Sequence, residues 1–191
     1  MNSNNKLYKI ILITLAGGFI YAINCGLRNN YGIMLNSVVE NSGTTIASVS
    51  FVFAVAQLVF GMVQPFLGII STKKGNFFTL TIGAILCTIG IILIPFSKSV
   101  ITLFFCMGVL IPAGTGALSY GVIIGSVSQK IPKKNISTFS GIINAFSGFG
   151  NSIMSPILNT LIIGGGLTYA MFVFSIPTLA IIPIAYMICL G

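Results

Sequence analysis

Arg28 is the residue with the clearest capacity for chemistry, because it lies in an otherwise apolar stretch. A guanidinium can hold a carboxylate through two parallel hydrogen bonds. Asn24 lies four residues before Arg28 and Tyr31 three residues after it, so a helix places all three on one face. This face is a candidate binding site for a small organic anion. Alternatively, Arg28 has a structural role, in which its side chain extends to the water interface on the outer side of the membrane or pairs with Glu40.

Further polar residues interrupt the later apolar segments. Glutamine is costly in lipid, so Gln57 and Gln64 are expected to face protein or a cavity. A tyrosine offers both an apolar face and a donor, which suits a small carboxylate cavity. Hydrogen bonding between helices and simple packing are the competing interpretations. The predicted substrate-binding residues are Asn24, Arg28, Tyr31, Gln57, Tyr120 and Asn144.

Enzymatic chemistry has almost no suitable side chains in this sequence. Glu40 is the one acidic residue among 191, and there is no histidine. The four cysteines lie inside apolar segments without a CxxC pair, which favours buried thiols over a disulfide or a metal site. No phosphate-binding glycine loop is present. We therefore expect no catalytic residues, no metal and no cofactor.

Long runs without formal charge indicate a membrane protein. No charge occurs between Lys74 and Lys98, nor from Asn135 to Gly191, and only ten residues of the chain are charged (nine basic, one acidic). Soluble proteins carry about 25% charged residues. The net charge of +8 comes from small clusters at the ends of apolar runs, a pattern that membrane topology explains better than nucleic-acid binding.

Six membrane-spanning helices are predicted, each covering about 20 apolar residues or more. The long continuous apolar runs exclude a β-barrel. The chain is thus expected to be an all-α integral membrane domain over residues 1–191. The predicted spans are 8–38, 44–71, 77–95, 101–127, 136–163 and 168–190.

The basic residues orient these spans. With both termini on one side, seven lysines fall on that side, while Glu40 and Lys98 fall on the other. The positive-inside rule then places both termini in the cytoplasm. The protein is accordingly expected in the inner (cytoplasmic) membrane of a cell. The seven lysines are Lys6, Lys9, Lys73, Lys74, Lys130, Lys133 and Lys134.

The loop after the second predicted span carries a family motif. Its sequence from Gly68 to Gly75 resembles the G-x-x-x-D-[RK]-x-G signature of the major facilitator superfamily. Gly68, Lys73 and Gly75 match the signature, and the resemblance implies that this loop gates the cytoplasmic side. Thr72 stands where the family usually has aspartate, which puts the charge pairing of such a gate in doubt.

Two further segments narrow the resemblance. Residues 25–33 (CGLRNNYGI) and 56–65 (AQLVFGMVQP) are similar to the first two helices of bacterial monocarboxylate and oxalate/formate porters. Members of this superfamily have two six-helix halves with the substrate between them. The resemblance implies the N-terminal half, with the C-terminal half absent from this sequence. The chain could be a truncated product, which we favour, one half of a split transporter, or one copy of a homodimer.

The expected function is secondary transport of a small mono- or dicarboxylate by alternating access. No carboxylate or histidine lies inside the predicted spans to carry protons, so the chain either exchanges anions as an antiporter or relies on coupling residues in the missing half. The alternatives are transport of a neutral or drug-like solute and a non-transporting subunit that assembles with a partner.

Overall fold

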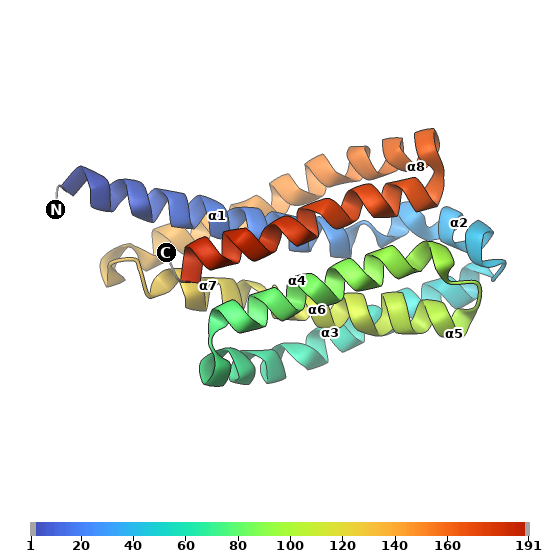
Figure 1. Cartoon of the computed structure of the whole chain (residues 1–191), viewed down its shortest axis with the longest axis horizontal. Coiled ribbons are helices and arrows are strands. Elements are labelled where there is room, and N and C mark those ends of the chain that lie inside the picture. The colour runs from blue at the N-terminus through green and yellow to red at the C-terminus, as the bar shows by residue number, and fades with distance from the viewer. Residues whose placement is uncertain (1–2, 190–191) are drawn as a thin grey trace.

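The computed structural model describes residues 3–189, with side chains from residue 8 onward, so the side chain of Lys6 and the predicted end of the last span at Leu190 lie outside the described part. Long helices run antiparallel along one bundle axis, and both ends of the chain lie at the same end of the bundle (Figure 1). The elements are α1 (Ser3–Asn29), α2 (Tyr31–Ser42), α3 (Ile46–Lys74), α4 (Asn76–Leu93), η1 (Ile94–Phe96), α5 (Val100–Leu103), η2 (Phe104–Leu110), α6 (Ile111–Ala117), α7 (Tyr120–Ser128), η3 (Lys133–Asn135) and α8 (Ile136–Cys189).

The first apolar segment is interrupted, whereas the sequence predicted one continuous helix to Val38. A turn at Asn30 separates α1 from α2. The Asn30 side chain donates through Nδ2 to the carbonyl oxygen of Gly26, at 2.6 Å. An asparagine that bonds the backbone in this way competes with the regular helical ladder.

Helices α3 and α4 form a hairpin. The Thr45 side chain accepts from the Ser48 amide and caps the start of α3. At the other end, Gly75 has φ +92°, a conformation that L side chains rarely adopt. The glycine therefore allows the tight reversal between Lys74 and Asn76.

The fourth apolar segment is the least regular part of the bundle. It contains α5, the π-helical η2, α6 and α7. The helix stops at Ala117, and Ser119 is extended, with φ −66° and ψ 156°. The sequence predicted a single span over 101–127, and Val100–Ser128 forms one span in the structure, with a break at Leu118–Ser119 that the sequence did not predict. Glycines at 114 and 116 weaken the helix just before it ends.

The last segment, α8, makes two passes. It covers 54 residues, and its backbone leaves the helical region at Gly166, where φ is 74°. Figure 1 shows the two limbs of α8 lying antiparallel on either side of this reversal. Five helical segments are apolar and long enough to cross a membrane, and the last of them, Lys133–Cys189, holds 57 residues. Counting its two limbs separately gives six passes, which confirms the predicted all-α membrane architecture.

Close approach of glycines holds the helices together. A Cβ on Gly150 of α8 would lie 2.1 Å from the carbonyl oxygen of Ala22 in α1. A Cβ on Gly114 of α6 would lie 2.7 Å from the backbone of Gly83 and of Cys87 in α4. Small residues at such crossings let backbones pack directly against each other, which is a common means of association in membranes.

Charged residues gather at the two ends of the bundle. The α3–α4 turn, with Lys73 and Lys74, and the segment before α8, with Lys133 and Lys134, lie at the end where the chain starts and stops (Figure 1). At the opposite end, Lys98 donates through Nζ to the Asn41 backbone carbonyl and side-chain oxygen, both at 2.9 Å.

Candidate functional site

A polar cavity of about 170 Å³ lies where α1, α3 and the start of α7 meet. We call it the arginine cavity. Helix α1 contributes residues at positions 21, 24, 25 and 28, a spacing that puts them on one face. The helix break before α7 adds two further lining residues, Ser119 and Tyr120. The lining residues are Tyr21, Asn24, Cys25, Arg28, Phe60, Gln64, Ser119 and Tyr120.

Arg28 supplies the positive charge of this cavity. Its guanidinium carbon lies 4.2 Å from the centroid of the Phe60 ring, within the range of a cation–π contact. No carboxylate pairs with Arg28 within residues 8–189, and Glu40, the one acidic residue of the chain, is exposed on α2. The suggested structural pair between Arg28 and Glu40 is therefore not formed. An aromatic face partly compensates the charge and leaves the guanidinium donors available.

Asn24 ties the arginine cavity to the helix break. Its Nδ2 donates to the Leu118 carbonyl oxygen at 2.9 Å. This bond fixes the amide orientation, because the carbonyl can only accept. The side chain is 2% exposed, and its Oδ1 has no partner among the described residues. A buried acceptor without a donor is costly, so the helix break carries an unsatisfied polar atom at this point.

Two tyrosines also line the arginine cavity. The rings of Tyr21 and Tyr120 have centroids 5.4 Å apart and are tilted at 51°. The Tyr120 hydroxyl donates to the Ser140 carbonyl oxygen in α8, at 3.1 Å. Aromatic walls with one strong positive charge give a cavity suited to a small ligand that has an apolar body and an anionic group.

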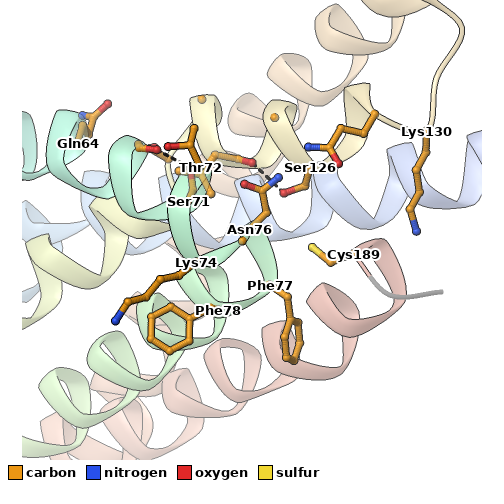
Figure 2. A pocket seen from close by; sticks show the side chains of 17 residues that line it. Gln64, Ser71, Thr72, Lys74, Asn76, Phe77, Phe78, Ser126, Lys130 and Cys189 are labelled. Carbon is orange, nitrogen blue, oxygen red and sulfur yellow. Dashed lines mark hydrogen bonds between the residues drawn. The ribbon is translucent and has the colours of Figure 1, made fainter.

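A second, wider cavity of about 980 Å³ continues from the first. Gln64 and Ser119 line both, so the two cavities adjoin at these residues. Figure 2 shows the wider cavity, with Asn76 and Ser126 between Lys74 on one side and Lys130 on the other. The wider cavity therefore extends from the interior of the bundle to its lysine-rich end.

Comparison with known proteins identifies the family. A model described as Major Facilitator Superfamily matches residues 17–190. The chain belongs to this superfamily. It is also similar to mouse (Mus musculus) "Monocarboxylate transporter 11", with 22% identity over 173 residues. That alignment covers 90% of the chain but 38% of the relative, so the chain spans well under half the length of that protein. Membership in this superfamily, together with the long apolar helices, makes the chain a multi-pass membrane protein of a transporter family.

The superfamily loop motif borders the wider cavity. Gly68 and Gly75 line it, whereas the exposed Lys73 does not. Lys74 places its ammonium 5.2 Å from the centroid of the Phe78 ring. Thr72, which replaces the usual aspartate, donates through its hydroxyl to the Ile69 carbonyl oxygen. The motif thus has aromatic and backbone contacts here in place of a carboxylate-centred pair.

Three of the predicted binding residues lie outside the arginine cavity. Tyr31 is buried outside the arginine cavity, with its hydroxyl 3.5 Å from the Met107 carbonyl oxygen, because the turn at Asn30 rotates it away from Arg28. Gln57 and Asn144 are exposed on the outer faces of α3 and α8. The cavity thus brings together Asn24, Arg28 and Tyr120 of the predicted set and leaves out the other three.

Tyr21, Cys25 and Phe60 line the cavity but were not among the predicted residues. For Tyr21 and Cys25 the signal was present, since they lie seven and three residues before Arg28 on the face that already held Asn24. Phe60 gave no such signal. A phenylalanine in an apolar span is indistinguishable from a packing residue until the helix that carries it is placed against Arg28.

Proposed function

We propose that this chain forms half of a secondary transporter that binds a small organic anion in the arginine cavity. The observation that carries the proposal is the guanidinium of Arg28, which has no carboxylate partner in residues 8–189 and adjoins a cavity that reaches the lysine-rich end. Arg28 is half-buried, and a cation with unpaired donors in a partly enclosed cavity attracts an anion more strongly than one in bulk water, because less water is present to screen it. The lysines at the cavity mouth raise the local anion concentration.

The comparison with the mouse protein supports a monocarboxylate as the first substrate class to test. That protein is named for monocarboxylates, and the chain aligns with 38% of its length. The arginine cavity, at about 170 Å³, is of a size for a small carboxylate. Dicarboxylates remain within the proposal, since a second carboxylate could extend towards Lys74 or Lys130.

We place the lysine-rich end in the cytoplasm and the bundle in the inner membrane of a cell. The argument is the positive-inside rule, because the lysines of the α3–α4 turn and of the segment before α8 lie at one end of the bundle, and Glu40 and Lys98 lie at the other. The wider cavity would then open inward, so the described conformation would be the inward-facing one.

A second six-helix half is the partner we propose. Gln57 on α3 and Asn144 on α8 are exposed, and uncovered amides are costly in lipid. A facing half would remove them from lipid and close the cavity on its open side. This half could be encoded in the same reading frame, supplied by another chain, or supplied by a second copy of this one.

Competition by a matched pair of solutes tests the proposed substrate class. We expect lactate to inhibit uptake of labelled lactate by the complete transporter, and lactamide, which has a similar shape without charge, to inhibit at least tenfold more weakly. Equal inhibition by both would favour the neutral-solute alternative. Absence of uptake for every solute, together with a stoichiometric co-purifying partner, would favour a non-transporting subunit.

We further propose that the transporter exchanges anions. The sequence has no histidine and one acidic residue, Glu40, which lies on α2 at the end opposite the wider cavity, so this half offers no proton carrier near Arg28. Loading vesicles with unlabelled lactate should raise the initial rate of labelled lactate uptake several-fold, and an imposed pH gradient across unloaded vesicles should not. Uptake driven by the pH gradient alone would contradict exchange.

A further inference from the structure

The break in the fourth span leaves a helix N-terminus beside Arg28. Helix α7 has nine residues and starts at Tyr120, directly after the extended Ser119. The Ile123 amide donates to the Ser119 carbonyl oxygen at 3.1 Å. The amides of Tyr120, Gly121 and Val122 precede this bond in the first turn and so have no partner within α7. Ser119 occupies the capping position, but its side chain accepts none of them. The first turn of α7 thus presents three backbone donors that the helix itself does not use, together with the positive end of its dipole.

These donors face the two cavities. Gly121 lines the wider cavity and has only backbone atoms to present to it. A Cβ built on Gly121 would have nothing within 4 Å, so the space in front of this backbone is open. Ser119 and Tyr120 line the arginine cavity together with Arg28. The guanidinium and the start of α7 therefore border the same space.

Two buried side chains at this place also lack partners. Ser119 is 6% exposed, lines both cavities, and its hydroxyl has no hydrogen bond to any described residue. Asn24 is 2% exposed and keeps an unpartnered Oδ1 while its Nδ2 holds the Leu118 carbonyl. Polar groups buried to this degree are normally satisfied. The Ser119 hydroxyl and the Asn24 side chain therefore add unsatisfied polar groups at the helix break, beside Arg28.

We infer that the substrate carboxylate is held between Arg28 and the N-terminus of α7, with backbone amides of Tyr120 and Gly121 as donors. This inference rests on the proposed function and locates its binding site. The amides of a first helical turn and the helix dipole favour an anion at this point without adding a second charged side chain. The Asn24–Leu118 bond positions the break beside Arg28.

Charge at position 119 gives the sharpest test. In S119D the new carboxylate would cap α7 and meet Arg28, occupying the site from within the chain. We expect lactate uptake by the complete transporter to fall at least 50-fold, with thermal stability equal to or above that of the wild type. S119N is the matched uncharged variant, because asparagine can also cap α7, and its uptake should exceed that of S119D at least tenfold.

A glycine pair on the same helix provides an independent test. The Cβ of a helical residue points towards the N-terminus, so in G121A the methyl group would enter the space in front of the first-turn amides of α7. We expect KM for lactate to rise about tenfold. G125A is the matched control, because Gly125 also lines the wider cavity and a Cβ there meets only the Asn76 Nδ2, at 3.9 Å. Its KM should be unchanged.

The outcomes separate the inference from the function on which it rests. If S119D and G121A transport lactate normally while R28Q does not, the site at α7 is wrong and the proposed function stands. If R28Q also transports normally, both are wrong. If S119D fails to fold, the comparison of G121A with G125A decides alone, and equal KM values in that pair would overturn the inference.

Discussion

Replacing Arg28 with glutamine abolishes carboxylate uptake, and this is the largest functional effect we expect. The substitution keeps a polar side chain of similar reach but removes the charge that holds the anion. Arg28 has an aromatic ring as its neighbour and no carboxylate within residues 8–189, so no buried anion loses its partner in the variant. The protein should therefore insert normally. Initial rates of labelled lactate uptake, normalised to the amount of protein in the membrane, measure the effect.

R28K is the matched variant for this position. Lysine keeps the charge but cannot bind a carboxylate through two parallel hydrogen bonds. We expect partial uptake, with KM raised about tenfold, which corresponds to roughly 1.4 kcal/mol. Wild-type uptake by R28Q would show that Arg28 is a structural residue, and the anion-binding account would fail.

Replacing Gly150 with alanine produces the largest loss of stability that we expect. The new Cβ would lie 2.1 Å from the Ala22 carbonyl oxygen and 2.7 Å from the Ala22 Cα, so α1 and α8 must move apart. Backbone cannot rearrange locally as a flexible side chain can. Overpacking costs about 1–3 kcal/mol, and here it also loosens the contact that positions the arginine cavity. Thermal unfolding of the detergent-solubilised protein should show a clear decrease in Tm.

G148A is the control for this experiment. Gly148 lies two residues away on α8, and a Cβ there would have nothing within 4 Å. Alanine also favours the helix by up to about 1 kcal/mol relative to glycine. The Tm of G148A should thus equal or exceed that of the wild type. Equal Tm values for both variants would mean that α1 and α8 do not approach closely at Gly150.

The number of passes and the position of most charges could be predicted from the sequence. Hydrocarbon excludes charge, so the intervals between charged residues report the spans directly. The helix breaks could not be predicted in the same way. Asn30 interrupts the first span through a bond to its own helix, and Ser119 is extended between two helices although its neighbours are apolar. Both breaks depend on contacts that a hydropathy pattern does not contain.

The candidate site could likewise be predicted only in part. Asn24 and Arg28 share a face of one helix, so their spacing predicted that they lie together, and they line one cavity. Tyr31 follows the same spacing but lies beyond the turn at Asn30, where the periodicity restarts. The exposed positions of Gln57 and Asn144 depend on which helices pack together, and polarity alone did not determine this.

The most direct test of the anion-binding account is an experimental structure of the complete transporter with its best-competing carboxylate bound. The account predicts density for the carboxylate against the Arg28 guanidinium and the first amides of α7, with the Ser119 hydroxyl beside it. Density for the ligand at another place, with Arg28 still stacked on Phe60, would contradict it.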